Sequence, residues 1–279
     1  MSTERILIAG CGKLGTALGR ELSEAGHTVW GLRRRAERIP EPIRPLAGDL
    51  ADPASLPALP EALDRIYYIA TPGAYDDTAY QRAYVHGLRN LLAALPNPDG
   101  RLVFVSSTSV YGQSDGREVD ESSPTEPTGF SGQRMLEAEH IALGWAGESV
   151  VVRFGGIYGP GRTRMIDKVR HGEACTAHPP AWSNRIHQAD CVGVLAHLGA
   201  ARITPGVYLA VDDAPCTQCE LMDWLAEQLG LPQPPRRNVG AGGFRAGSKR
   251  CRNDKLRASG YRFRYPSYRE GYAAMLKEM

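Results

Sequence analysis

The sequence predicts an α/β protein with a doubly wound parallel sheet and a smaller C-terminal lobe. Two observations support this fold class. Through residue 153, short β-branched runs alternate with amphipathic helical stretches, which is typical of a parallel sheet covered on both faces. After residue 153, glycine, proline and arginine become frequent and the alternation fades, which indicates a second part rich in loops. The chain has 279 residues, enough for one large domain or for a domain with a smaller appendage.

Short runs, most of them rich in β-branched or aromatic residues, mark the strands of the first part. These runs cover residues 5–9, 28–32, 44–47, 65–70, 101–106 and 149–153. Apolar residues at helical spacing mark two helices between them, over residues 13–25 and 80–95. Both helices are expected to pack on the sheet.

The second part of the chain has fewer regular patterns. Helical patterns occur near residues 190–201, 221–229 and 268–277, and one strand-like run covers 207–211. The segment 232–248 is rich in proline, glycine and arginine, which indicates a long surface loop. We therefore expect a sheet domain over residues 1–158, completed by 187–211, and a smaller lobe made of 159–186 and 212–279.

Composition argues against several classes of protein. Hydrophobic residues make up 42% and charged residues 23%, as in globular rather than disordered or fibrous proteins. The net charge of +2 is too balanced to predict a nucleic-acid partner. No run approaches the ~18 apolar residues that cross a bilayer, and the first residues do not resemble a signal peptide. A cytoplasmic protein without a membrane or nucleic-acid partner is expected.

The six cysteines are few and irregularly spaced, unlike the dense framework of a small secreted domain. All are expected to be reduced thiols. Cys216 and Cys219 form a C-x-x-C motif, but no second pair of ligands stands at metal-binding spacing nearby. We expect these two residues to lie at the entry of a helix rather than to bind zinc or act in redox chemistry, and no metal site is predicted.

A glycine motif, G-x-G-x-x-G, follows the first strand and opens the first helix. Gly10 is suited to a sharp turn, Gly12 to close approach of a pyrophosphate, and Gly15 to close packing of helix and strand. The helix begins near Lys13 and Leu14, where free amides and the positive end of the helix dipole attract phosphate. The motif therefore predicts a dinucleotide site on a Rossmann fold.

The end of the second strand predicts which dinucleotide binds. NAD is usually held by an acidic side chain there, but this strand runs instead into Arg33, Arg34 and Arg35. Guanidinium groups suit the 2′-phosphate of NADP, so NADP is favoured over NAD. A solvated basic turn is the alternative interpretation.

Gly48-Asp49-Leu50 follows the third strand and offers a third contact with the cofactor. The Asp49 carboxylate could accept a hydrogen bond from the adenine amino group while Leu50 packs on the ring. A helix-capping aspartate would have the same sequence pattern.

Further along the chain, segments 103–112, 124–139, 153–162 and 184–190 resemble, in this order, motifs of the extended short-chain dehydrogenase/reductase family. This family comprises NAD(P)-dependent epimerases and dehydratases of nucleotide sugars. The glycine motif is one residue tighter than the family's usual G-x-x-G-x-x-G, a departure that resembles the bacterial YeeZ-like subgroup.

The resemblance implies roles for individual residues. Ser107 would position the substrate oxygen, while the family's Y-x-x-x-K motif falls on Phe130 and Arg134. Phe130 has no proton to exchange, so hydride transfer would lack its usual acid-base partner. Arg134 could still hold the nicotinamide ribose. The resemblance also implies cofactor contacts at Ala70, Thr71, Gly155 and Ile157.

Another side chain could supply the missing proton. Tyr75 is the preferred candidate, because it follows the fourth strand and the carboxyl ends of such strands border the ligand crevice. Tyr111, Tyr158 and His187 lie in segments that flank the same crevice by resemblance. A structural role is the better interpretation for each of these four residues.

Three arginines in the second part could hold a phosphate or carboxylate of the substrate, because guanidinium groups pair with such anions in a bidentate manner. They are Arg162, Arg164 and Arg185. Salt-bridged loop anchors are an equally good interpretation. Substrate contacts are thus predicted at Tyr111, Arg162, Arg185 and His187.

Two functions remain open. The first is an NADP-dependent oxidoreductase, epimerase or dehydratase acting on a small sugar-like or phosphorylated carbonyl compound. The second is a catalytically inactive protein that senses NADP(H) or regulates a partner, which would explain Phe130 directly. A monomer or homodimer is expected in either case.

Overall fold

The computed structural model describes residues 3–200, 202–238 and 248–279. The chain forms two compact units, which are described separately. Unit 1 comprises Met1–Val110, Pro127–Arg153 and Val192–Tyr208, and unit 2 comprises Tyr111–Glu126, Phe154–Cys191 and Leu209–Met279. Unit 2 thus includes a segment, Tyr111–Glu126, that the sequence places within the sheet domain.

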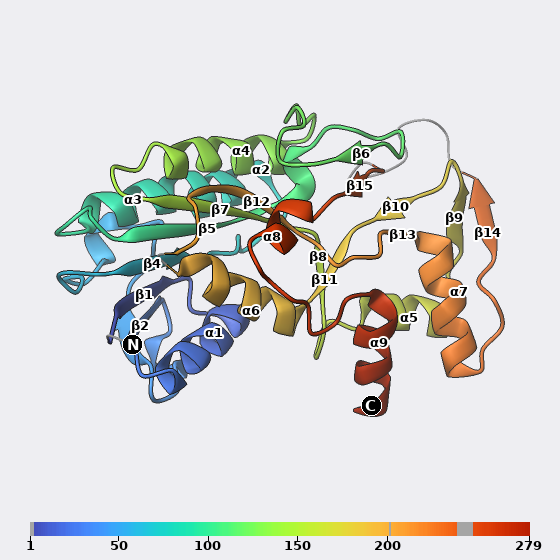
Figure 1. The fold of residues 1–279 in the computed structure, drawn as a ribbon, viewed down its shortest axis with the longest axis horizontal. Coiled ribbons are helices and arrows are strands. Elements are labelled where there is room, and N and C mark those ends of the chain that lie inside the picture. The colour runs from blue at the N-terminus through green and yellow to red at the C-terminus, as the bar shows by residue number, and fades with distance from the viewer. Residues whose placement is uncertain (1–2, 201, 239–247) are drawn as a thin grey trace. The chain divides into compact units, whose positions relative to one another are not determined.

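Unit 1 is built on a seven-stranded sheet with the order β12-β7-β5-β4-β1-β2-β3 (Figure 1). The pairs β1–β2, β1–β4, β2–β3 and β4–β5 are parallel. This is the doubly wound arrangement, in which the strand order reverses beside β1 and ligands bind at that point. The strands are β1 (Arg5–Ala9), β2 (Thr28–Arg33), β3 (Arg44–Ala47), β4 (Arg65–Tyr68), β5 (Arg101–Ser107), β7 (Ser149–Phe154) and β12 (Gly206–Ala210).

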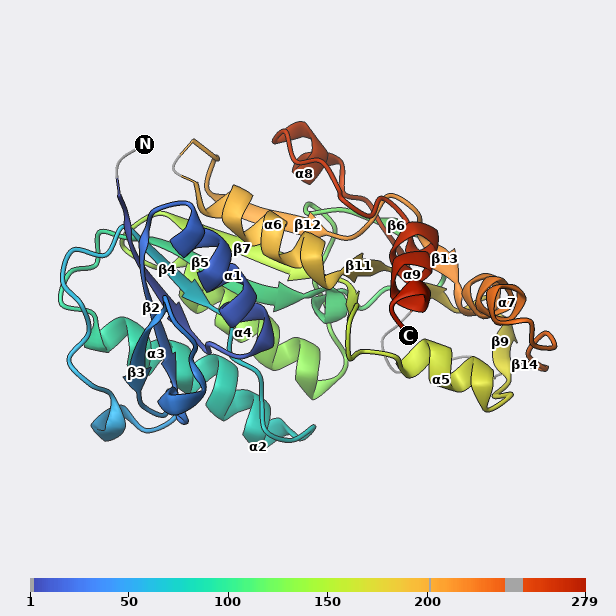
Figure 2. The same cartoon turned by 90° about the horizontal axis from the view of Figure 1, so that it is seen from below.

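Helices cover both faces of this sheet. In both views α1 and α6 run beside each other on one face, while α2, α3 and α4 cover the other (Figures 1 and 2). Helix α1 buries Leu14, Leu18 and Leu22, the apolar stripe expected from the sequence. The helices are α1 (Lys13–Glu24), α2 (Asp77–Tyr80), α3 (Gly87–Ala94), α4 (Phe130–Leu143) and α6 (Gln188–Gly199), with short turns η1 (Ala36–Arg38), η2 (Pro53–Ser55) and η4 (Thr108–Val110).

The helix predicted over 80–95 is divided differently in the structure. Helix α2 begins three residues earlier, and a π-helical segment η3 (Gln81–His86) precedes α3. The Tyr68 hydroxyl donates a hydrogen bond to the carbonyl of Ala83, the group that would accept from Gly87 in a regular α-helix. A side chain inserted into the backbone ladder in this way explains the wider turn.

Unit 2 consists of four helices and several two-stranded sheets within its described residues. Helices α5, α7 and α9 surround a core that includes Tyr158, Met165, Leu225 and Tyr272. The helices are α5 (Arg164–Arg170), α7 (Gln218–Leu229), α8 (Asp254–Ala258) and α9 (Tyr268–Lys277). The paired strands are β8 (Gly156–Tyr158) with β11 (Arg185–His187), β9 (Cys175–His178) with β14 (Arg236–Asn238), β10 (Trp182–Ser183) with β13 (Cys216–Thr217), and β6 (Glu118–Val119) with β15 (Arg250–Cys251).

Two predicted segments of the second part extend into residues outside the described part of the chain. The segment 232–248, predicted as a loop, contains β14, and its residues 239–247 lie outside the described part of the chain. The helix predicted over 190–201 corresponds to α6, and residue 201 also lies outside the described part. Within the described residues, no helix is long and apolar enough to span a bilayer.

Candidate functional site

The glycine turn after β1 has a geometry that only glycine satisfies. Gly10 has a φ of +84°, and a Cβ there would lie 2.7 Å from the backbone of Ile69. A Cβ on Gly15 would lie 2.9 Å from the side chain of Ile8. At Gly12, by contrast, the nearest atom to a Cβ is the Gly10 carbonyl oxygen at 3.9 Å. Gly10 and Gly15 are therefore needed for packing, whereas Gly12 borders open space.

The N-terminus of α1 faces this open space with its amides free of side-chain caps. Gly12 is the N-cap residue, it makes no side-chain cap hydrogen bond, and the first turn of α1 carries no acidic residue. The positive end of the helix dipole is therefore not compensated locally. These features fit a bound diphosphate, because backbone N–H groups are its usual ligands at such a turn.

The basic residues after β2 lie next to the glycine turn. Arg33 Nη1 donates a hydrogen bond to the carbonyl oxygen of Cys11, 3.3 Å away. Arg34 and Arg35 are exposed to solvent. The guanidinium group of Arg33 is thus held beside the turn, while the side chains of Arg34 and Arg35 are accessible to a ligand from solvent.

Asp49 forms hydrogen bonds within the loop that follows β3. Its Oδ1 accepts a hydrogen bond from the Ala51 amide at 3.0 Å, and its own amide donates to Ser55 Oγ at 2.9 Å. The carbonyl oxygen of Leu50 accepts from Asn90 Nδ2 at 2.9 Å. These bonds hold the loop after β3, and the adenine contacts of Asp49 and Leu50 stay predictions.

Two consecutive serines at the end of β5 differ in burial and in hydrogen-bond partners. Ser106 is buried and donates to Glu139 Oε1 at 2.5 Å, and Glu139 in turn pairs with buried Arg153 at 2.6 Å. Ser107 is partly exposed, and its Oγ accepts from the Ser109 amide at 3.1 Å. The Ser107 hydroxyl hydrogen can therefore still be donated to a ligand, as the predicted role requires.

Phe130 begins α4 and lies in a cluster of aromatic rings. Its ring centroid lies 5.1 Å from that of Tyr75 and 5.4 Å from that of Tyr80. Tyr75 is 60% exposed, and its hydroxyl oxygen lies 3.5 Å from Oγ of Ser131. The structure thus brings a tyrosine hydroxyl and a serine hydroxyl next to the ring that stands at the family's tyrosine position.

The guanidinium group of Arg134 is engaged by acidic side chains. Its Nε and Nη2 donate to the two carboxylate oxygens of Asp77 at 2.7 and 3.0 Å, and Nη1 donates to Glu137 at 3.1 Å. The hydrogen bond from Arg134 lowers the pKa of Asp77. Arg134 therefore anchors the start of α2 to α4, and its predicted contact with a ribose would require it to share these donors.

Unit 2 contains a pocket of about 300 Å³ lined by the three arginines that the sequence singles out. Arg162 and Arg164 are exposed, and Arg185 is partly buried. The Nε of Arg185 is buried and has no hydrogen-bond partner among the described residues. The other lining residues are Gly156, Ile157, Tyr158, Met165 and Tyr272.

A buried acid lies behind Arg185. The Asp212 amide donates to the Arg185 carbonyl oxygen at 2.6 Å, and Asp212 itself is 2% exposed. Its Oδ1 accepts from the Ala214 amide, while Oδ2 is buried without a partner among the described residues. Burial raises the pKa of Asp212 to about 8. In its protonated form Asp212 carries no charge that would offset the positive charge of Arg185.

The other predicted residues of this region have structural partners. The Tyr111 hydroxyl donates to the Asp120 carbonyl oxygen at 2.7 Å, and Tyr158 stacks on Tyr272 with ring centroids 4.4 Å apart. His187 is buried, and its Nδ1 accepts from the Ala189 amide at 3.2 Å. Burial, with a contribution from the charge of Arg264, lowers the pKa of His187. These contacts agree with the structural interpretation of the three residues.

The residues predicted to contact the cofactor after β4 and β7 are divided between the two units. In unit 1, Thr71 is exposed, and the amide of Ala70 lies against the position that a Gly10 Cβ would occupy. Unit 2 holds Gly155 and Ile157. A Cβ on Gly155 would lie 2.8 Å from the Asn184 carbonyl oxygen, so this glycine is needed for packing.

The cysteine prediction was wrong for one pair. Cys175 and Cys219, 44 residues apart, form a disulfide, whereas Cys11, Cys191, Cys216 and Cys251 are buried and form no disulfide. The C-x-x-C motif does stand at the entry of a helix, α7, but its second cysteine pairs outside the motif. Among the described residues, no group of His, Cys, Asp or Glu is arranged to hold a metal ion.

Sequence reasoning also missed Ser131, Asp77 and Asp212. Ser131 is adjacent to Phe130, so its hydroxyl was a detectable signal. Asp77 contacts Arg134, 57 positions away, and Asp212 contacts Arg185, 27 positions away. No local sequence pattern marks contacts between residues so far apart.

Comparisons with known proteins find similar sequences over most of the chain. The family model "NAD dependent epimerase/dehydratase family" matches residues 6–202. Protein YeeZ of Escherichia coli (strain K12) is 27% identical over 285 residues, covering 94% of this chain and 97% of that protein. The dTDP-6-deoxy-L-talose 4-dehydrogenase (NAD(P)(+)) of Kitasatospora kifunensis is 33% identical over 252 residues, covering 81% of this chain and 79% of that protein.

Solved structures share the fold over nearly the whole chain. A protein from Methylobacillus flagellatus is 37% identical with a TM-score of 0.80, covering 100% of this chain and 99% of that one. MoeE5, solved in complex with UDP-glucose and NAD, is 25% identical with a TM-score of 0.77, covering 96% of each chain.

Proposed function

Because this chain belongs to the NAD-dependent epimerase/dehydratase family, we propose that it binds NADP(H) in unit 1 and transforms a small sugar-like or phosphorylated carbonyl compound. The reaction class is oxidoreduction, epimerisation or dehydration. The observation that carries the proposal is the glycine turn, where Gly12 leaves space beside the uncapped amides of α1. When bound, a nicotinamide dinucleotide donates or accepts a hydride.

Two relatives support the cofactor and substrate classes. One is a 4-dehydrogenase of a dTDP-linked deoxysugar that uses NAD(P)(+), and another was solved with UDP-glucose and NAD. Both names combine a nicotinamide dinucleotide with a nucleotide sugar. Substrates of this kind carry a diphosphate, which matches the chemistry of the arginine-lined pocket in unit 2.

The preference for NADP rests on the residues after β2. Arg33 is held at the glycine turn by its bond to the Cys11 carbonyl oxygen, and Arg34 lies next to it in sequence and is exposed. Calorimetric titration with NADPH and NADH tests this preference. Arg34→Gln should weaken NADPH binding roughly 5- to 20-fold and leave NADH binding unchanged, since only NADPH has the phosphate that pairs with guanidinium. Tighter binding of NADH than of NADPH to the wild type would refute it.

Within unit 1, Ser107 would orient the substrate oxygen and Tyr75 would exchange the proton. The Tyr75 hydroxyl lies 3.5 Å from Ser131 Oγ, so Ser131 can orient the tyrosine hydroxyl through a hydrogen bond. Tyr75→Phe should then leave NADPH affinity intact and lower turnover by roughly 10²-fold or more. Tyr80→Phe removes a hydroxyl from the same aromatic cluster and serves as the matched control. Equal turnover in all three proteins would exclude Tyr75.

A binding protein without catalysis is the second candidate function. It is favoured by two specific observations: Phe130 packs among aromatic rings, and Arg134 is already paired with Asp77 and Glu137. The two functions separate when NADPH oxidation is followed in the presence of a panel of nucleotide sugars and phosphorylated carbonyl compounds. Oxidation by any of them supports the enzyme, whereas tight NADPH binding without oxidation supports the sensor.

The double substitution Phe130→Tyr with Arg134→Lys refines this comparison. It restores the family's acid-base pair on α4, one helical turn apart. Enhanced activity in this variant would show that the remaining scaffold is still able to support catalysis.

A further inference from the structure

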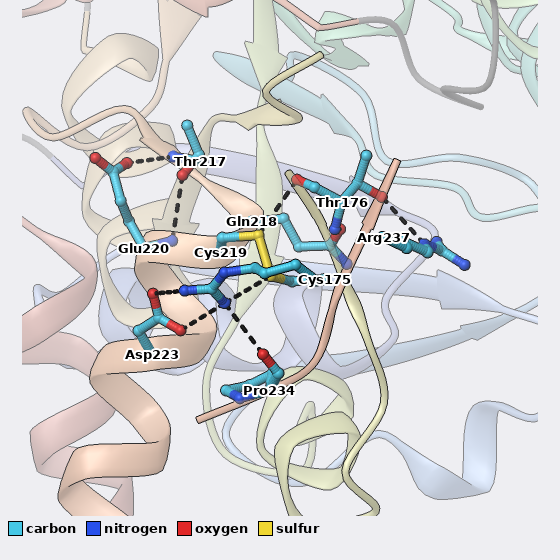
Figure 3. The surroundings of a disulfide bond; sticks show 10 residues. Cys175, Thr176, Thr217, Gln218, Cys219, Glu220, Asp223, Pro234 and Arg237 are labelled. Carbon is cyan, nitrogen blue, oxygen red and sulfur yellow. Dashed lines mark hydrogen bonds and ion pairs between the residues drawn. A yellow bond between two sulfur atoms is a disulfide. The ribbon is translucent and has the colours of Figure 1, made fainter. Parts of the chain in front are cut away.

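The disulfide in unit 2 joins the beginning of a strand to the beginning of a helix. Cys175 is the first residue of β9, and Cys219 is the second residue of α7 (Figure 3). The bond is surrounded by polar and charged side chains that are arranged around the two sulfur atoms. The other four cysteines form no disulfide.

The two cysteines differ in their access to solvent. Cys175 is completely buried, whereas Cys219 is partly exposed. Of the two residues, Cys219 is therefore the one that a thiol arriving from solvent can approach. In thiol–disulfide exchange, the sulfur that is not attacked leaves as a thiolate.

The buried sulfur has a cation beside it. Arg236 Nη1 donates to Cys175 Sγ at 2.9 Å, and the same nitrogen donates to the Pro234 carbonyl oxygen at 3.2 Å. Asp223 on α7 holds the guanidinium group in place with bonds of 2.8 and 2.6 Å (Figure 3). Arg236 is therefore positioned to stabilise negative charge that develops on Cys175.

Cys219, the partly exposed cysteine of the pair, lies at a helix N-terminus. Thr217 caps α7 by accepting from the Glu220 amide at 3.2 Å, and the Glu220 carboxylate accepts from the Thr217 amide at 2.7 Å. Cys219 lies within this first turn, where the helix dipole favours a thiolate. Each sulfur thus has a separate feature that stabilises its anionic form.

We propose that Cys175 and Cys219 form a reversible thiol–disulfide exchange site whose reaction partner is a dithiol. A thiolate of the dithiol attacks Cys219 Sγ, forming a mixed disulfide and breaking the Cys175–Cys219 bond. The bond's electron pair leaves on Cys175 as a thiolate beside Arg236. The second thiolate of the dithiol then displaces Cys219, so that the protein gains two electrons and the dithiol becomes a disulfide. The reverse sequence reoxidises the protein. This inference goes beyond the proposed function and does not depend on it.

The direction of attack is tested with single cysteine variants. Cys175→Ser leaves the Cys219 thiol, and Cys219→Ser leaves the Cys175 thiol. Each variant is incubated with oxidised glutathione in the folded state, and the mixed disulfide is located by peptide mass mapping. We expect the mixed disulfide at Cys219 to form at least 10-fold faster than that at Cys175. Equal rates, or a faster reaction at Cys175, would overturn the proposed direction.

The role of Arg236 is tested by the rate at which dithiothreitol reduces the intact disulfide in the folded protein. Trapping with a maleimide followed by intact mass measurement gives this rate. Arg236→Gln should slow reduction roughly 3- to 10-fold, because the leaving thiolate loses its cation. Arg237→Gln is the matched control, since Arg237 donates to Thr176 Oγ1 on the same pair of strands.

Asp223→Asn distinguishes loss of the positive charge beside Cys175 from loss of the ion pair between Arg236 and Asp223. It breaks the same ion pair as Arg236→Gln but leaves the cation beside Cys175 without its counter-charge. We expect reduction to be as fast as in the wild type or faster. If both variants accelerate reduction equally, the ion pair has only a structural role and the proposal fails. It also fails if the wild-type disulfide is reduced only after unfolding.

Discussion

The glycine turn of unit 1 and the arginine pocket of unit 2 are both suited to anions, but by different means. The turn uses backbone amides and the space beside Gly12, and its first helical turn carries no acidic residue. The pocket uses the guanidinium groups of Arg162, Arg164 and Arg185, with a buried acid, Asp212, behind them. The first site depends on backbone shape and the second on side-chain charge. Substitutions should therefore affect the two sites in different ways.

The largest expected effect concerns Asp212. Its pKa is raised from the ordinary 3.8 to about 8 by burial, so folding favours the protonated acid. Below pH 4 both the folded and unfolded states are protonated. Between pH 4 and pH 8 Asp212 ionises in the unfolded state but stays protonated in the folded state, so its contribution to the free energy of unfolding falls. Above pH 8 this loss stops growing.

Asp212→Asn removes this titration. Its free energy of unfolding, relative to that of the wild type, should rise by about 2–5 kcal/mol between pH 4 and pH 8. Urea unfolding at several pH values measures the difference. A difference that stays constant from pH 4 to pH 9 would show that Asp212 ionises normally in the folded protein.

Gly10→Ala should be the next most severe change. The alanine would have to adopt a φ of +84° with its Cβ 2.7 Å from the Ile69 backbone, and we expect a loss of about 3 kcal/mol in stability. Gly26→Ala is the matched control, because Gly26 has a φ of +91° but nothing within 4 Å of a Cβ. Thermal unfolding of both variants separates steric conflict from backbone strain. Equal losses would mean that the close approach to Ile69 is unimportant.

Gly12→Ala should act on binding rather than on stability. The added methyl group has room in the free protein but occupies the space expected for the diphosphate. We expect NADPH affinity to fall roughly 10- to 100-fold with an unchanged melting temperature, as measured by calorimetry and thermal unfolding. Unchanged affinity would place the diphosphate elsewhere.

The smallest expected effect is at the pocket. Arg185→Gln should weaken binding of inorganic pyrophosphate by a factor of roughly 3 to 10, because two other arginines remain and solvent screens their charges. Arg170→Gln changes an exposed arginine at the end of α5 that does not line the pocket, and it should leave binding unchanged. Equal weakening in both variants would indicate attraction by net charge rather than a specific site.

Local patterns accounted for most of the sheet. The predicted bounds of β1 and β3 match the structure, because a glycine, Gly10 or Gly48, directly follows each strand. The glycine motif was recognisable because its three glycines lie within six residues of the sequence, directly after β1. The π-helical segment η3 was not predictable, because it depends on a hydroxyl from Tyr68 on another element.

The candidate site was predictable only in part. Ser107, Tyr75 and the three arginines could be singled out by residue type and position. Their partners could not, because Ser131 meets Tyr75 across 56 positions and Asp77 meets Arg134 across 57. The disulfide was missed since its two cysteines are brought together only by the packing of α7 against β9.

The order of strands and helices and the glycine turn were thus determined by the sequence itself, because side-chain periodicity and backbone preference act over a few neighbouring residues. Tertiary structure alone decided which sulfur atoms pair, which acid is buried behind Arg185, and which hydroxyl lies beside Phe130. These outcomes depend on contacts between distant parts of the chain, and such contacts form only when burial of the whole core brings those parts together.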